Sequence, residues 1–388
     1  MKWTLALLAL ALAAPAARAE EPIKVGVIAP FSGPFADYGK EMEAGIKAWV
    51  KLNGDAVAGR KVEVLFRDTT GPLPDVAKRL AQELVVREKV DFLAGFGLTP
   101  EALAVADIAT QAKRPMLVMN AATSIITTKS PFVVRFSMTL PQISAPVATW
   151  AAKNGIKKVF TLVADYGPGI DAEGAFKKAF AAGGGTVVDS VRTPLRSPEF
   201  APFIQRIKDA KPDAVFVFVP AGEQGIGFMK AFQERGLAQA GIRAIATGDI
   251  TDDHVLDAMG EVALGMVTSF HYSAAHDSPE NRAFLEAYQQ VASGLGRANF
   301  MAVAAYDAMA AVYDVVKRLD GKVDAEKAVD LLKGWKRQSP RGPISIDPET
   351  RDIVQDIYIR KVEKRADGHY YNVEFDRVPA FKDPGKQP

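Results

Sequence analysis

KVGVIAP, residues 24–30, is a short and continuous apolar run, and the loop Ser32-Gly33-Pro34 follows it directly. Similar β-rich runs recur along the first half of the chain, and stretches with apolar residues at helical spacing separate them. The runs are 62–66, 90–96 and 116–119, and the helical stretches are 41–52, 75–89 and 100–112. Continuous apolar strands flanked by helices are typical of a parallel sheet covered on both faces.

The same rhythm starts again at Lys158. Strands are predicted at 158–163, 186–191, 214–219 and 242–247, with helices at 171–182, 200–210, 225–235 and 253–259. This repetition predicts an α/β protein with two doubly wound parallel-sheet lobes. Three further helical stretches, 279–292, 300–319 and 325–335, have to cover a lobe already built. The segment 344–375 has the pattern of strands, with a hairpin turn at Asp367-Gly368.

The first 19 residues have the pattern of an export signal. Lys2 supplies the positive charge, Trp3–Ala14 the apolar run and Ala17-Arg18-Ala19 the cleavage pattern. The apolar run is shorter than the roughly 18 residues that a membrane span needs. We therefore expect cleavage after Ala19 and export to the periplasm; an uncleaved N-terminal anchor is the alternative.

Composition excludes several classes of partner and chemistry. The chain has 48 basic and 46 acidic residues, and loss of Lys2 and Arg18 with the signal leaves 46 of each. A neutral protein lacks the basic surface that nucleic acids and anionic membranes require. The chain has no cysteine, so disulfides, thiol catalysis and thiolate metal sites are excluded.

No catalytic motif is present. The sequence contains neither a phosphate-binding GxxxxGK[ST] loop nor a GxSxG nucleophile elbow. Its four histidines have no metal-binding spacing, and Ser273, His276 and Asp277 are neighbours along one loop, whereas triad residues meet in space. We therefore expect no enzymatic activity, no metal and no cofactor.

Polar loops at the carboxyl ends of the predicted strands are the candidate ligand site, because open α/β sheets bind ligands there. Thr99 and Pro100 are expected as N-cap and first residue of a helix, a start that favours an anion. Thr123 and Ser124 add hydroxyl groups after the next strand. In the second half, Tyr166 and Asp249 follow strands. Simple helix capping and lobe packing are alternative roles for these residues.

Taken in order, five segments resemble the leucine/isoleucine/valine-binding protein family, the type I periplasmic solute-binding proteins of ABC importers. They are IKVGVIAPFSGPFADYG (23–39), VDFLAGFGLTPEALAVAD (90–107), LVMNAATS (117–124), VADYGPG (163–169) and AAYDAM (304–309). The resemblance implies a three-crossover hinge between lobe 1 (23–137 plus 267–341) and lobe 2 (138–266 plus 342–388). It also implies a small carboxylate ligand clasped between the lobes, an inner-membrane ABC permease as partner, and a monomer.

The resemblance assigns a role to each site residue. Tyr38 matches the aromatic residue at the cleft mouth, and Thr99 the hydroxyl residue that holds the ligand carboxylate together with backbone N–H groups. Ala122 and Thr123 match the second carboxylate loop, Tyr166 the aromatic residue over the ligand, and Asp249 the glutamate that binds the ammonium group of branched-chain amino acids. Further candidates near the pocket are Ser124, Phe270, Phe300 and Met301.

Two departures from the family pattern bear on the ligand. Asp249 is one methylene shorter than the family's glutamate, and Pro220-Ala221 stands near a position where amino-acid receptors carry a tyrosine. A hydrophobic amino acid, branched-chain or aromatic, is the leading expectation. A non-amino aromatic carboxylate (benzoate- or phenylpropanoid-like) or a short amide is the alternative. A ligand-presenting sensor for a membrane receptor and an exported hydrolase are rival functions.

Overall fold

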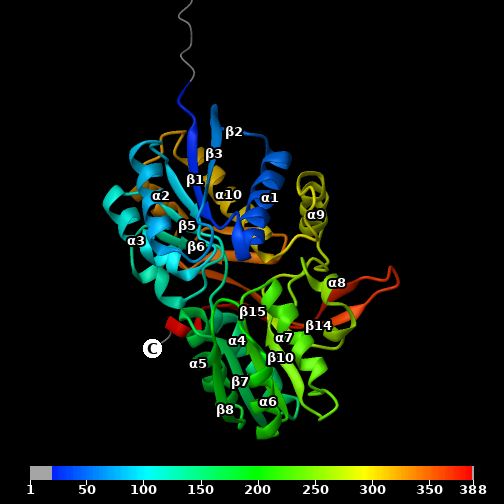
Figure 1. Cartoon of the computed structure of the whole chain (residues 1–388). Helices are drawn as coiled ribbons and strands as arrows, with labels where there is room; N and C mark the ends of the chain where they lie inside the picture. Colours follow the sequence, from blue (N-terminus) through cyan, green and yellow to red (C-terminus); the bar gives the residue numbers. More distant parts are fainter. Residues whose placement is uncertain (1–19, 387–388) are drawn as a thin grey trace, which may run out of the picture.

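The computed structural model describes residues 20–386. The expected export signal, residues 1–19, lies outside the described residues. Two α/β bodies lie one above the other, and long strands from the end of the chain run between them (Figure 1). We call the body around the first sheet the first lobe and the body around the second sheet the second lobe.

The first lobe is built on a six-stranded sheet in the order β2-β3-β1-β4-β5-β6. Its central strand, β1, pairs in parallel with β3 and β4, and only β2 runs antiparallel to its neighbour. The apolar run Ile23–Ala29 that forms β1 is almost entirely buried, as expected for a strand with helices on both faces. The strands are β1 (Ile23–Ala29), β2 (Ala56–Val57), β3 (Arg60–Asp68), β4 (Phe92–Gly95), β5 (Met116–Val118) and β6 (Val133–Arg135).

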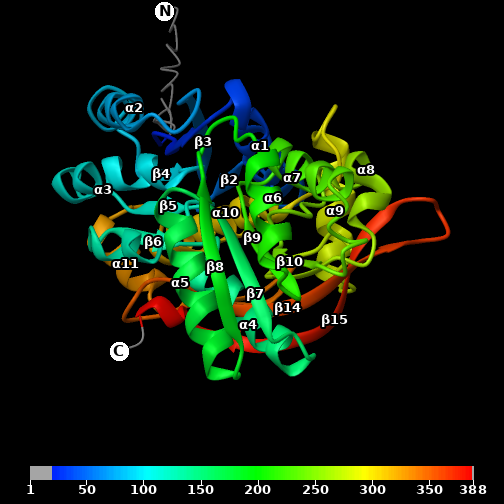
Figure 2. The same ribbon diagram turned by 60° about the horizontal axis from the view of Figure 1, so that its bottom comes forward.

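The second lobe has a nine-stranded sheet. The strands β8-β7-β9-β10-β11 are parallel, and β12, β13, β14 and β15 add antiparallel strands on the β11 side. The bounds are β7 (Lys158–Ala164), β8 (Thr186–Thr193), β9 (Ala214–Phe218), β10 (Arg243–Thr247), β11 (Val267–Phe270), β12 (Lys336–Ser339), β13 (Gly342–Ile346), β14 (Ile353–Lys364) and β15 (Tyr370–Phe381). The turn of the β14–β15 hairpin contains Asp367 and Gly368, as predicted, and projects beside α8 (Figure 2).

Helices cover both sheets. Those of the first lobe are α1 (Ala36–Asn53), α2 (Pro74–Val86) and α3 (Thr99–Ala112), joined by the later α9 (Pro279–Val291), α10 (Phe300–Arg318) and α11 (Ala325–Leu332). Those of the second lobe are α4 (Leu140–Lys153), α5 (Gly167–Ala182), α6 (Ala201–Ala210), α7 (Glu223–Glu234) and α8 (Leu256–Met259). Short 3₁₀ turns are η1 (Gly33–Phe35), η2 (Ser124–Thr128), η3 (Gly260–Ala263) and η4 (Pro384–Lys386). Helix α1 packs against α9 and α10, so the late helices return to the first lobe.

The chain crosses between the sheets three times, after β6, after β11 and after α11. The last two crossings differ from the boundaries expected at 266/267 and 341/342. Strands β11 and β12 belong to the nine-stranded sheet, because β11 extends it beside β10 and β12 pairs with β13. Which sheet a four-residue strand joins depends on tertiary pairing that periodicity does not encode.

Helix α4, Leu140–Lys153, has no counterpart in the sequence prediction. Pro141 occupies its first turn and Pro146 lies inside it, so the segment lacks the usual helical signature. Packing decides its structure: α4 lies against α5 and against strands β10, β11 and β14. Within the described residues, no helix is long and apolar enough to cross a membrane.

Candidate ligand-binding site

A small pocket lies between the lobes at the carboxyl ends of their strands. It is narrow in this structure, with about 20 Å³ open to the centre of a water molecule. Five of the six main predicted residues line it, namely Tyr38, Thr99, Ala122, Tyr166 and Asp249. The sixth, Thr123, contacts the pocket residue Thr99, since their hydroxyl oxygens are 2.9 Å apart. The topology therefore brings together residues that are up to 211 positions apart in the sequence.

The start of α3 differs by one residue from the prediction. Leu98, with extended backbone, is the N-cap, and Thr99 is the first helical residue. Glu101 takes over the capping role by accepting a hydrogen bond from the Leu98 N–H at 2.9 Å. The Thr99 hydroxyl is therefore not consumed by capping and lies in the pocket wall beside the Thr123 hydroxyl.

Backbone N–H groups without a partner among the described residues occur in this wall and directly beside it. Within residues 20–386, the N–H groups of Thr99, Ala122 and Thr123 donate to no carbonyl or side chain. The Thr99 N–H belongs to the first turn of α3, where the helix dipole adds positive potential. Buried N–H groups without partners are rare in folded proteins. This wall therefore has the chemistry of an anion-binding site.

Tyr38 closes the pocket from α1. Its position depends on Gly39, whose N–H donates to the Pro30 carbonyl at 3.0 Å; a Cβ at residue 39 would lie 2.4 Å from that oxygen. The Tyr38 hydroxyl donates to the Ala221 carbonyl of the second lobe at 3.4 Å. Burial raises the pKa of Tyr38, so its hydroxyl stays a neutral donor.

The lobes also touch at Gly167, the first residue of α5. A Cβ there would lie 2.7 Å from the Thr123 Oγ1 atom, so glycine permits this approach. On the same side, the Ser124 N–H donates to the Asp171 Oδ2 atom of α5 at 2.9 Å. With the Tyr38–Ala221 contact, these approaches describe a closed arrangement of the two lobes.

The wall contributed by the second lobe is acidic. Asp249, which follows β10, is buried and accepts a hydrogen bond from the Thr247 hydroxyl at 2.7 Å. Burial raises the pKa of Asp249 to about 6, and hydrogen bonding partly opposes that rise. Near neutral pH this carboxylate is therefore an acceptor for a ligand hydroxyl or ammonium group. Tyr166 lies beside it, half-buried, and its ring stacks on Phe218 with centroids 6.1 Å apart.

Apolar side chains and prolines fill the remaining sides of the pocket. They are Leu98, Met138, Leu140, Pro168, Phe218 and Pro220. None of them was predicted as a site residue. Phe218 ends β9 and Pro220 follows it, so both could have been found by the strand-end rule, whereas Met138 and Leu140 lie at the first crossing, which no local pattern marks.

The further candidates lie outside this pocket. Phe270 and Phe300 pack edge to face with centroids 4.8 Å apart, next to the buried His271. Met301 lines a neighbouring cavity beside Tyr38. The backbone of Ser124 contacts α5, as described above, and its hydroxyl lies near Gly385 of the C-terminal segment. None of these four residues lines the pocket.

Two lobes that close over a pocket with donors on one side and an acid on the other form a solute-binding clamshell. The chain belongs to the periplasmic binding protein family, whose model matches residues 22–368. It is a solute-binding protein of an ABC transporter, works with a membrane permease and is not an enzyme. The family expected from the sequence motifs is thereby confirmed.

Similar proteins carry names and bound ligands of two kinds. The chain is 50% identical to the Leu/Ile/Val-binding protein homolog 6 of Brucella melitensis biotype 1, covering 98% of this chain and 97% of the relative. A solute-binding protein of Rhodopseudomonas palustris BisB5, solved with 3,4-dihydroxybenzoic acid, is 55% identical, with a TM-score of 0.91 and coverage of 94% and 99%. A homologue from the HaA2 strain, solved with p-hydroxybenzoic acid, is 48% identical, with a TM-score of 0.92 and coverage of 95% and 99%.

Proposed function

We propose that this protein binds a hydroxylated benzoate in the interlobe pocket and delivers it to an ABC permease. The carboxylate lies on the first-lobe wall, where Thr99 and Thr123 offer hydroxyl groups and Ala122 offers an N–H group. The ring lies between the apolar side chains, and the ring hydroxyl faces Asp249. The observation that carries this proposal is the set of unpaired N–H groups at Thr99, Ala122 and Thr123, opposite a buried acid.

The energetics are adequate for this assignment. A charge-assisted hydrogen bond is worth about 1.5–3 kcal/mol, and burial of apolar surface adds about 25 cal/mol per Å². Two or three such bonds and one buried ring face supply about 8 kcal/mol, which corresponds to micromolar affinity.

Aromatic ligands fit the second-lobe wall well. A phenol donates one hydrogen bond, which a single buried carboxylate such as Asp249 accepts. Tyr166 and Phe218 present stacked rings to the pocket, and an aromatic ligand packs favourably against them. Two solute-binding proteins that are 55% and 48% identical to this chain were solved in complex with hydroxybenzoic acids, which agrees with this ligand class.

A hydrophobic amino acid is the second candidate, because Asp249 is an anion that an ammonium group could pair with. The names of the Brucella relatives also favour it. We further propose that residues 1–19 are an export signal cleaved after Ala19, and that the mature protein is a periplasmic monomer without affinity for nucleic acid.

Titration calorimetry of the purified protein decides between the candidates. We expect 4-hydroxybenzoate to bind with a Kd of about 1 µM or lower, and L-leucine and L-phenylalanine at least about 100-fold more weakly. Tight binding of leucine without measurable binding of any benzoate would refute the proposed ligand.

A further inference from the structure

The carbonyl groups of the 121–123 loop are held from behind the pocket. The Arg135 Nη2 atom donates to the Thr123 carbonyl at 2.7 Å, and its Nη1 atom donates to the Ala121 carbonyl. Between them, the Ala122 carbonyl accepts from the Leu140 N–H at 3.0 Å. Three consecutive carbonyls are therefore fixed, two of them by one guanidinium group.

This anchoring also directs the amides of the loop. In a planar trans peptide, the C=O and the following N–H point in opposite directions. Because Arg135 holds the Ala121 carbonyl, the Ala122 N–H points away from Arg135, and it meets no acceptor in the described chain. In the same way, the bond to the Thr123 carbonyl directs the Ser124 N–H to Asp171 of the second lobe. One side chain thus orients a pocket amide and an interlobe amide.

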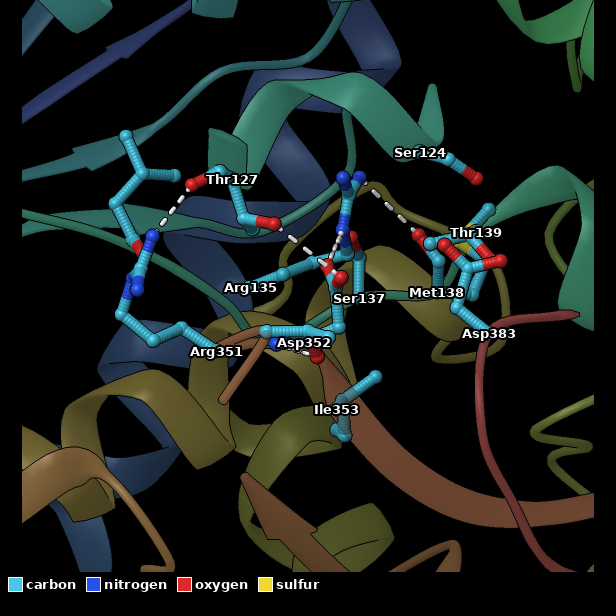
Figure 3. Close-up of polar contacts among 12 residues, drawn as sticks. Ser124, Thr127, Arg135, Ser137, Met138, Thr139, Arg351, Asp352, Ile353 and Asp383 are labelled. Carbon is cyan, nitrogen blue, oxygen red and sulfur yellow. Dashed lines mark hydrogen bonds and ion pairs between the residues drawn. The ribbon is translucent and has the colours of Figure 1, made fainter. Parts of the chain in front are cut away.

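The guanidinium is itself fixed by Asp352, the residue directly before β14. Arg135 is fully buried, and its Nε atom lies 2.8 Å from the Asp352 Oδ1 atom (Figure 3). The other Asp352 oxygen accepts from the Thr127 hydroxyl at 3.2 Å and from the Lys386 ammonium group. A guanidinium group spreads its donors over three nitrogens in one plane and can hold two carbonyls and a carboxylate at once, whereas the single nitrogen of a lysine does not match this geometry.

We propose that Arg135 is a positioning residue for ligand binding: it holds the 121–123 loop so that the free Ala122 N–H group faces the ligand carboxylate. Arg135 does not touch the ligand. The inference rests on the proposed function only in requiring a carboxylate on the first-lobe wall, whatever group the ligand carries at its other end.

Arg135→Lys tests this role through a ratio of affinities. Calorimetric or displacement titrations measure Kd for 4-hydroxybenzoate and for its neutral analogue 4-hydroxybenzamide. General damage to the fold weakens the binding of both ligands alike. A misaligned first-lobe wall weakens the binding of the acid alone. We expect the preference for the acid over the amide to fall at least about tenfold in R135K, as loss of a charge-assisted hydrogen bond predicts.

Arg341→Lys is the matched control. Arg341 is also fully buried, pairs with Asp307 at 3.0 Å and donates to the carbonyls of Phe136 and Ser137 in the same hinge, but not to the ligand loop. We expect R341K to keep the wild-type preference within about twofold, the usual scatter of single-contact effects. A wild-type preference in R135K, or an equal fall in R341K, would overturn the proposal.

A measurement on the wild-type chain covers the case in which R135K does not fold. Saturation with 4-hydroxybenzoate should slow hydrogen exchange of the Ala122 amide at least about tenfold, because that N–H gains an acceptor. No protection at Ala122 would also overturn the proposal. If the protein binds L-leucine and no benzoate, the ligand proposal fails, and the comparison of L-leucine with L-leucinamide tests Arg135 independently.

Discussion

The two walls of the pocket have opposite chemistry. The first-lobe wall offers donors, namely the hydroxyl pair of Thr99 and Thr123 and backbone N–H groups that have no partner within residues 20–386, and the amide of Asn120 also lines it. The second-lobe wall offers an acceptor, the buried carboxylate of Asp249. The difference gives the pocket a polarity: an anionic group belongs on the first lobe and a donor on the second. A ligand with both groups bridges the lobes and stabilises the closed form.

Removing a hydroxyl from the donor wall should have the largest effect. We expect Thr99→Ala and Thr123→Ala each to weaken 4-hydroxybenzoate binding about 10- to 100-fold, since each removes a charge-assisted hydrogen bond. Calorimetry measures the change, with Thr128→Ala as control, because Thr128 is exposed and bonds only the nearby Ile125 carbonyl. Wild-type affinity in both pocket variants would remove the anion assignment.

Replacing the carboxylate of Asp249 by a neutral amide should affect the affinity for ligands with a ring hydroxyl more than the affinity for ligands without one. We expect Asp249→Asn to weaken 4-hydroxybenzoate about tenfold, because a charged acceptor becomes a neutral one, and to leave benzoate nearly unchanged. Competition titrations of both ligands against both proteins give the comparison. Equal losses for the two ligands would place the ring hydroxyl elsewhere.

Contact between the lobes beside the pocket should depend on pH. In the closed form His254 of the second lobe lies 3.0 Å from Glu41 of α1, with Asp37 and Asp252 close by. Hydrogen bonding to Glu41 raises the pKa of His254 from 6.5 to about 9, although burial opposes the rise. Burial raises the pKa of Glu41 itself, and that of Asp252 to about 7.

Because contact with Glu41 of the other lobe raises the His254 pKa, the stabilisation that protonated His254 gives to the closed form is complete below pH 6.5 and is lost as pH rises through 9. We expect benzoate affinity to fall about tenfold between about pH 7 and about pH 10, and His254→Gln to flatten this dependence. Benzoate is the suitable probe because it carries no phenol that titrates in this range. If the benzoate affinity of the wild-type protein does not fall over this pH range, the contact between His254 and Glu41 does not take up a proton on closure.

The smallest effect is expected at the aromatic side of the acceptor wall. Tyr166→Phe keeps the ring that stacks on Phe218 and removes only the hydroxyl, which is neutral because burial raises the pKa of Tyr166. A two- to threefold loss of 4-hydroxybenzoate affinity, about 0.5 kcal/mol, is the expected result in titrations. A loss above about tenfold would make Tyr166 a principal ligand contact.

Much of the fold and part of the site follow from the sequence for identifiable reasons. Continuous apolar runs such as Ile23–Ala29 mark buried strands, and the strand-end rule finds the loops of Thr99, Thr123 and Asp249. Helix α4 does not follow from the sequence, because its two prolines are atypical of a helix. The lobe to which β11 belongs does not follow either, because strand pairing is a tertiary property.

One feature of the sequence around Arg135 could have indicated its role. Arg135 is a charged residue inside the apolar segment Phe132–Phe136, and a buried charge requires partners. Those partners, Asp352 and the 121–123 carbonyls, lie more than 200 and about 12 positions away, so only the folded chain identifies them.

A crystal structure of the complex with 4-hydroxybenzoate tests the polarity of the pocket most directly. We expect the carboxylate within hydrogen-bond distance of Thr99, Thr123 and the Ala122 N–H, and the ring hydroxyl at Asp249. A ligand bound in the reverse orientation, with its carboxylate toward Asp249, would contradict this expectation.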